Sequence, residues 1–202
     1  MRPIMRSTMR LGRSVPLLVL AVFLLAGCET PAPRRFPEIT FQHLPKIRID
    51  VARIEYAPRY QPPVAPPNIG HEFPVPPAAA AERWIADRLV AVGKRGVATV
   101  TIEQATATEK RLSVTKGIKG AFTTDQAWRY NVRVAMSIKA IDPDRQRTAT
   151  ARAEARVSRT MPEDASLADR EAVWFALTEK AMKRLNRVFE SEIRKDLAAF
   201  VK

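Results

Sequence analysis

The strongest periodic signal in the chain lies in residues 128–158, WRYNVRVAMSIKAIDPDRQRTATARAEARVS. Every even-numbered residue from Trp128 to Ala140 is apolar, and most of the odd-numbered residues between them are polar. Side chains of a strand alternate between its two faces, so this pattern predicts a strand with one buried face. A turn follows at 142–144. Odd-numbered alanines and a valine then alternate with polar residues over 149–157, which predicts a second strand with small inward side chains.

Small inward side chains imply that a bulky element packs closely on that strand. We expect this element to be the C-terminal helix, because Ser166 and Asp169 have the spacing of a capping box and Pro162 ends the strand before it. An apolar stripe at helical spacing then continues to the end of the chain. Its residues are Leu167, Trp174, Leu177, Ala181, Leu185, Val188, Phe189, Ile193 and Leu197.

Three further elements are predicted upstream. Alternation over 47–56 predicts a strand, and a change of phase within it suggests a β-bulge near Arg53. Helical spacing over 78–92 predicts a helix with Gly93 as its C-terminal cap. Residues 97–112 are rich in Thr and Val and predict another strand.

The element order is therefore strand, helix, three strands, helix (β-α-β-β-β-α). It predicts an α+β fold, a two-layer sandwich with two helices on one face of a four-stranded mixed sheet. We expect a single α/β domain over 46–202, after a Pro-rich tether at 28–45. A Pro-rich loop at 57–77 interrupts the domain. We interpret it as a covering loop because it carries the apolar residues Tyr60, Ile69 and Phe73; a polyproline ligand segment is the alternative.

Residues 1–27 have the pattern of a bacterial export signal. Four arginines without an acidic residue precede the apolar stretch Val15–Leu25, which is too short to span a bilayer. The stretch ends in Leu25-Ala26-Gly27-Cys28, which resembles the lipobox of bacterial lipoproteins. The resemblance implies removal of the lipoprotein signal peptide and attachment of fatty acyl chains, such as palmitate, to Cys28, the only cysteine of the chain. An ordinary secretory signal with a chance cysteine is the alternative.

Glu29, and not aspartate, follows this cysteine. By resemblance to the enterobacterial sorting rule, this points to the outer membrane, with the domain facing the periplasm. The net charge is +13 at pH 7. Such a charge suits an anionic partner, but nucleic acid is not expected because export removes the protein from it.

No catalytic constellation is recognisable in the sequence. His43 and His71 have no second histidine, cysteine or acidic cluster at ligand spacing, so we expect no metal and no cofactor. Glu103 and Glu109 have no partner that spacing identifies. No nucleophile elbow and no Gly-rich phosphate loop occur. We therefore expect a protein that is not an enzyme.

Two groups of cations are candidates for binding an anionic partner. The first lies on the polar face of the two alternating strands and is opposed only by Glu154; its members are Arg129, Arg133, Lys139, Arg152 and Arg156. The second lies in the 113–124 loop and consists of Lys116, Lys119 and the aromatic Phe122. A merely solvated face and an ordinary hairpin loop are the respective alternatives.

In topology over about 46–200, and in its export signal, the chain resembles the lipopolysaccharide-assembly lipoproteins, which plug a translocon barrel. The resemblance implies a non-enzymatic outer-membrane lipoprotein that acts as a binding or assembly accessory in the cell envelope. Its partners would be the lipid bilayer, through acylated Cys28, a barrel or transport complex, and anionic lipid. Two alternatives are an auxiliary lipoprotein of a phospholipid-transport ABC system and an activator of a peptidoglycan synthase.

Overall fold

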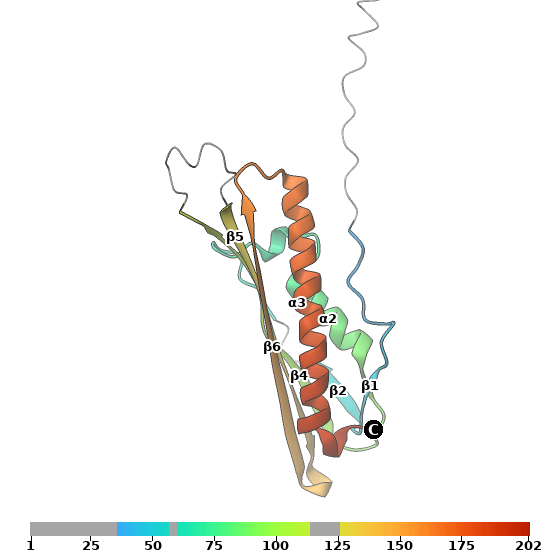
Figure 1. Ribbon diagram of the computed structural model, residues 1–202. Coiled ribbons are helices and arrows are strands. Elements are labelled where there is room, and N and C mark those ends of the chain that lie inside the picture. Colours follow the sequence, from blue (N-terminus) through green and yellow to red (C-terminus); the bar gives the residue numbers. More distant parts are fainter. Residues whose placement is uncertain (1–35, 57–59, 114–125) are drawn as a thin grey trace, which may run out of the picture. The chain divides into compact units, whose positions relative to one another are not determined.

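Strand β5 (Gln126–Asp142) lies at the centre of the fold in the computed structural model, which describes residues 36–56, 60–113 and 126–202. It pairs antiparallel with β4 (Val97–Arg111) and with β6 (Arg147–Pro162) (Figure 1). Its even-numbered residues from Tyr130 to Ala140 are all buried, which confirms the alternation read from the sequence.

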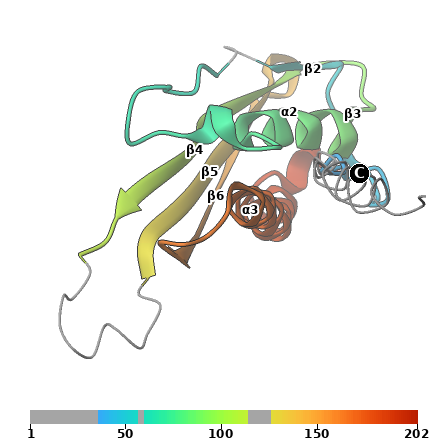
Figure 2. The ribbon, with the colours of Figure 1, turned by 90° about the horizontal axis from the view of Figure 1, so that it is seen from above.

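Strand β2 (Arg53–Tyr56) pairs parallel with β4 and completes a four-stranded mixed sheet in the order β2-β4-β5-β6. Helices α2 (Pro77–Arg88) and α3 (Leu167–Asp196) lie on the same face of this sheet (Figure 2). The predicted α+β fold with two helices on one face of a mixed sheet is confirmed.

Helix α3 packs closely on β6 because the inward side chains of that strand are small. Ala151, Ala153 and Ala155 are buried beneath it. The capping box is present: Ser166 Oγ accepts from the Asp169 amide at 3.2 Å, and the Asp169 carboxylate accepts from the Ser166 amide at 3.3 Å. Among the described residues, neither α3 nor any other helix combines the length and the apolar character needed to cross a membrane.

The strand predicted over 47–56 is in fact two strands in different sheets. Strand β1 (Ile47–Ile49) pairs parallel with β3 (Leu89–Ala91) in a small two-stranded sheet, whereas β2 belongs to the main sheet. The chain turns between them at 50–52, where the Val51 amide donates to the Ile49 carbonyl at 2.8 Å. The change of phase near Arg53 therefore marks a change of sheet, and the predicted bulge is wrong.

The helix predicted over 78–92 also ends early. It stops at Arg88, and 89–91 extend to form β3 because β1 supplies parallel backbone partners. Gly93 is therefore not its cap. A Cβ there would stand 2.5 Å from Asp50 Oδ1 and 2.7 Å from the Val51 amide, so glycine is needed for the close approach of two backbones.

The last residues of the chain pack against β1. A short 3₁₀-helix, η4 (Ala198–Phe200), follows α3 and buries the Phe200 side chain. The Asp50 amide donates to the Phe200 carbonyl at 2.6 Å, and the Lys202 amide donates to the Arg48 carbonyl at 3.0 Å. The small sheet is thereby tied to the end of the chain.

Part of the predicted tether belongs to the folded domain. Ile39 and Phe41 are buried, and the Phe41 amide donates to the Asp87 carboxylate at 2.8 Å. Phe36 stacks on Phe175 of α3 with ring centroids 5.2 Å apart. The prediction of a free tether is therefore wrong for 36–45, where apolar side chains hold the chain against the domain. Residues 28–35 lie outside the described residues.

The Pro-rich segment lies along β4 beyond the end of β2. The Ile69 amide donates to the Ala107 carbonyl and the Glu109 amide donates to the Pro67 carbonyl, both at 2.9 Å. Phe73 is buried and stacks on Trp174 at 5.2 Å. The segment thus satisfies backbone groups that the short β2 leaves open on β4, which is the arrangement of a covering loop. Residues 57–59 are not described.

Arg88 joins the helices to the N-terminal segment. Its side chain is 1 % exposed, and its Nε donates to Asn186 Oδ1 at 3.1 Å. The other guanidinium nitrogens donate to the Pro45 carbonyl and to the Glu190 carboxylate. Trp84 Nε1 also donates to Asn186 Oδ1, at 2.8 Å. One buried cation therefore holds the end of α2, the middle of α3 and the residues before β1 together.

We predict that Arg88→Met lowers the free energy of unfolding by about 2 kcal/mol, because the Pro45 carbonyl and Glu190 Oε2 lose their charged donor. Asn186 keeps its hydrogen bond from Trp84, so the loss is limited to these two contacts. The matched control is Arg83→Met on the same helix, whose exposed pair with Glu38 (3.1 Å) should contribute under about 1 kcal/mol. Urea unfolding followed by circular dichroism measures both variants. Equal effects of the two substitutions would contradict the role given to Arg88.

We also predict that Gly93→Ala destabilises the domain by roughly 1–3 kcal/mol, because the new methyl group overlaps the backbone at Asp50 and Val51. Gly70→Ala is the control, since a Cβ at Gly70 meets its nearest neighbour at an ordinary 3.5 Å. Thermal unfolding midpoints compare the two. A Gly93 variant as stable as the Gly70 variant would show that the close approach is not required.

Candidate binding surface

The face of the main sheet turned away from the helices carries the cations predicted from the sequence. We call it the outer sheet face and define it by the outward residues of β4, β5 and β6. Arg133 lies directly opposite Arg156, Ser137 opposite Arg152, and Lys139 opposite Thr150. The fold therefore brings the five predicted cations of β5 and β6 onto one surface: Arg129, Arg133, Lys139, Arg152 and Arg156.

Glu154 is at the centre of this face. Arg133 binds it in a bidentate manner, with Nε 2.8 Å from Oε1 and Nη2 2.9 Å from Oε2, and Arg156 Nε also donates to Oε1. These hydrogen bonds, first from Arg133 and then from Arg156, lower the pKa of Glu154 to about 2. The same carboxylate raises the pKa of Arg133.

A second carboxylate lies on the face. Arg152 Nε pairs with Glu103 Oε1 at 3.0 Å. Glu103 lies at a β-bulge of β4, where the register with β5 shifts between Ile102 and Gln104. The expectation that Glu154 alone opposes the cations is therefore wrong, because spacing within one strand does not show which strand lies beside it.

Two predicted cations keep their charge unopposed. Within the described part of the chain, Arg129 and Lys139 form no ion pair, and both are exposed. Lys110 of β4 lies directly opposite Arg129 and adds a third exposed cation. Most of the positive charge without a described ion-pair partner therefore lies toward the two ends of the outer sheet face. At its centre, Glu154 and Glu103 offset most of the charge of the three arginines.

A polar hollow of about 400 Å³ lies on this face between the charged ends. It is lined mainly by hydroxyl, amide and guanidinium groups; the polar members are Gln104, Thr106, Thr108, Asn131, Arg133, Arg156 and Ser158. These groups supply hydrogen-bond donors and acceptors that suit a phosphate or a sugar. Sequence reasoning found its two arginines but not Thr106 and Thr108, whose outward direction on β4 depends on the bulge at Glu103.

The remaining candidates from the sequence cannot be placed on this surface. Lys116, Lys119, Phe122 and Cys28 lie outside the described residues. Within the described ranges, no group of three or more His, Cys, Asp or Glu side chains could hold a metal ion.

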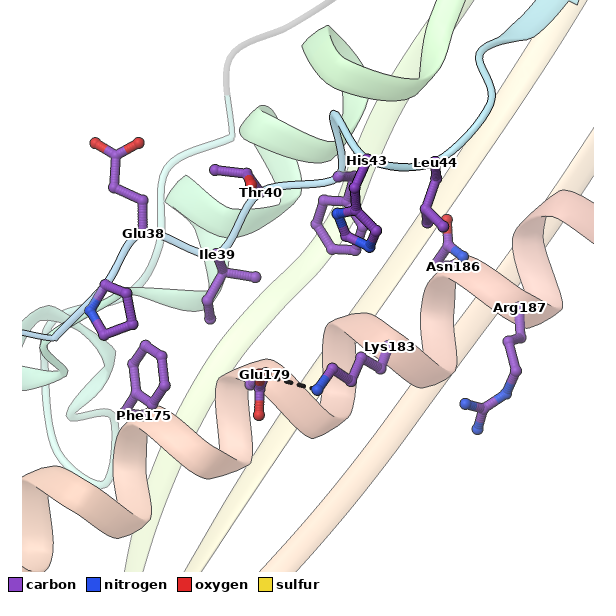
Figure 3. Close-up of a pocket in the computed structure, with 12 residues that line it drawn as sticks. Glu38, Ile39, Thr40, His43, Leu44, Phe175, Glu179, Lys183, Asn186 and Arg187 are labelled. Carbon is purple, nitrogen blue, oxygen red and sulfur yellow. Dashed lines mark ion pairs between the residues drawn. The ribbon is translucent and has the colours of Figure 1, made fainter.

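A second concavity lies between the N-terminal segment and α3 (Figure 3). It has a volume of about 500 Å³, and the segment 37–44 runs alongside α3 from Phe175 to Arg187. Lys183 points toward Glu179, with which it pairs at 2.9 Å. Sequence reasoning missed this groove because 36–45 was assigned to the tether, although its apolar residues were a signal that it packs.

No protein-family model and no curated protein matches the chain. Solved structures that are similar to it include rare lipoprotein B from Shewanella oneidensis (TM-score 0.39, 11% identity, covering 72% of this chain and 96% of that one). A minor lipoprotein from Acinetobacter baumannii is similar with a TM-score of 0.34 and 9% identity, covering 71% of this chain and 93% of that one. A DUF330 protein from Xanthomonas campestris is similar with a TM-score of 0.32 and 12% identity, covering 82% of this chain and 94% of that one.

We predict that the carboxyl of Glu154 titrates with a midpoint of about 2 in an NMR pH titration. Its pKa is lowered from 4.5 in the folded protein, so its ion pairs stabilise the fold above about pH 4.5 and are lost as the pH falls toward 2. The stability difference between the wild type and Glu154→Gln should shrink over that interval. A midpoint near 4.5 would contradict the bidentate arrangement.

Proposed function

We propose that this protein is a non-enzymatic outer-membrane lipoprotein that acts by binding an envelope partner, as an assembly accessory, from the periplasmic side. The lipobox resemblance at Leu25–Cys28 supports the anchor. More than one acyl chain on Cys28 would make the attachment effectively permanent. The domain would then work within a short distance of the bilayer.

The observation that carries the proposal is the outer sheet face. Its exposed cations, Lys110, Arg129 and Lys139, frame a hollow that offers hydroxyl, amide and guanidinium groups. Such a surface attracts an anionic group over a long range and then holds it by directed hydrogen bonds. An acidic protein surface or a phosphorylated glycolipid has this chemistry.

The length of the connection favours a partner in the same membrane. Because 36–45 packs on the domain, only seven residues, 29–35, separate Cys28 from Phe36. The eight Cα–Cα steps from Cys28 to Phe36 span at most about 29 Å when fully extended. This reach suits a β-barrel in the same membrane as the anchor, which is the partner expected from the resemblance to the lipopolysaccharide-assembly lipoproteins. It is a poor match for a peptidoglycan-synthase activator or for a transporter in the opposite membrane.

We predict that reversing Arg129 and Lys139, which form no ion pair with any described residue, reduces capture of the partner at least fivefold when both are changed to Glu. The assay is cross-linking in living cells, followed by detergent extraction and mass spectrometry of co-purifying proteins. Lys46→Glu with Arg48→Glu is the matched control, since it changes the charge equally on exposed residues of the small sheet and its approach. Capture that survives in the outer-face variant would refute this role for the face.

Cys28→Ala serves as a second control in the same experiment. It removes the acyl attachment point and should release the domain from the membrane fraction. The assembly role is supported if a single barrel protein co-purifies with the wild type and is lost both with the Arg129→Glu/Lys139→Glu variant and with Cys28→Ala. Abundant envelope proteins recovered equally from all strains would oppose it.

A further inference from the structure

Helix α3 exposes a stripe of cations on its flank beside the edge strand β6. Lys180, Lys183, Arg184 and Arg187 follow each other at helical spacing and are all exposed, and 180–187 contains no carboxylate. We call these four residues the helix stripe. They are distinct from the outer sheet face, because α3 lies on the opposite side of the main sheet (Figure 2).

The charge of the helix stripe is only slightly neutralised. Lys183 pairs with Glu179 at 2.9 Å, and Arg184 donates to the Arg156 carbonyl at 3.3 Å, a contact that orients the guanidinium and leaves its charge intact. Lys180 and Arg187 form no ion pair with any described residue. Three of the four charges therefore remain available to an anionic partner.

The same four cations line a hollow beside β6. It has a volume of about 600 Å³, and its other walls are Val157, Ala176 and Glu179. Val188 continues the stripe and is 37 % exposed, so an apolar side chain stands at the edge of the cationic surface. Cations around a hollow, with an apolar residue beside them, suit the phosphate and glycerol region of a lipid surface.

The position of the anchor brings this surface to a bilayer. Phe36, where the described chain begins, stacks on Phe175 at 5.2 Å. Arg187 lies twelve residues further along α3, which corresponds to about 18 Å. The eight Cα–Cα steps from Cys28 to Phe36 span up to about 29 Å. The whole helix stripe is therefore within reach of a membrane that holds Cys28.

We propose that the helix stripe docks on the anionic phospholipid headgroups of the membrane that holds the acyl anchor. The inference rests on the proposed lipid attachment at Cys28. Docking lays α3 against the bilayer and turns the outer sheet face away from it. The protein thus has two cationic surfaces with separate tasks, one for the lipid surface and one for the partner.

The test uses the acylated chain, purified from membranes in detergent and reconstituted into vesicles. A fluorophore on Ser191→Cys, which is exposed on α3 one turn beyond Arg187, reports quenching by nitroxide-headgroup lipid. We expect strong quenching in vesicles of phosphatidylcholine and phosphatidylglycerol at about 3:1, and weak quenching in phosphatidylcholine alone or at about 1 M salt. A triple variant with Lys180→Glu, Arg184→Glu and Arg187→Glu should reduce the ratio of docked to undocked protein by more than about a hundredfold, because each cation contributes about fivefold.

The matched variant reverses three cations on the outer sheet face, at Lys110, Arg129 and Lys139, and should leave the quenching unchanged. Thermal unfolding confirms that both variants are folded. Equal quenching in neutral and anionic vesicles, or quenching that persists in the helix-stripe variant, would overturn the docking. The intact mass of the purified chain tests acylation separately: an unmodified Cys28 refutes the anchor, and flotation of that chain with the same vesicles still tests the helix stripe.

Discussion

The buried guanidinium of Arg88 is the constraint on which the arrangement of this domain depends. A cation can be buried only where acceptors surround it, and here they come from Asn186 and Glu190 on α3 and from the Pro45 carbonyl. Meeting that requirement fixes α2 against α3 and draws the N-terminal segment onto both. The path of the segment along α3 in turn places Phe36 on Phe175. The point where an anchor would leave the domain is thus set by one ionic contact in the core.

This geometry separates two cationic surfaces that net charge alone would not distinguish. On the outer sheet face, Glu154 and Glu103 neutralise most of the charge of the central arginines, so most of the remaining charge lies at the ends. On α3, the stretch 180–187 contains no carboxylate. The first surface combines restricted charge with many directed hydrogen-bonding groups, which suits a specific partner. The second combines denser charge with few other polar groups, which suits a membrane surface.

The sequence predicted the parts of the fold that repeat a simple period over many residues. The alternation along β5 and the alanines of β6 showed which face is buried and where α3 packs, because each pattern extends over four or more two-residue repeats of a strand. Strands β1 and β3 have three residues each, so their alternation cannot be told from a bulge or from the last turn of a helix. Their pairing is fixed by tertiary contacts.

The candidate site was predictable in composition but not in electrostatics. Outward cations follow directly from strand parity, as Arg129 and Arg152 show. Their neutralisation depends on which carboxylate lies across the sheet. The pair of Arg152 with Glu103 joins non-neighbouring strands through a bulge that no residue pattern marked. The helix stripe was not predicted from the sequence, although the spacing of its four cations places them on one face of a helix.

Site-specific photo-cross-linking in living cells tests most directly whether the two surfaces have separate tasks. A photoreactive residue would be placed at Thr150, opposite Lys139 on the outer sheet face, and at Ser191, beside the helix stripe. The account predicts a discrete protein adduct from Thr150 and a phospholipid adduct from Ser191. Lipid adducts from Thr150, or the same protein adduct from both positions, would contradict it.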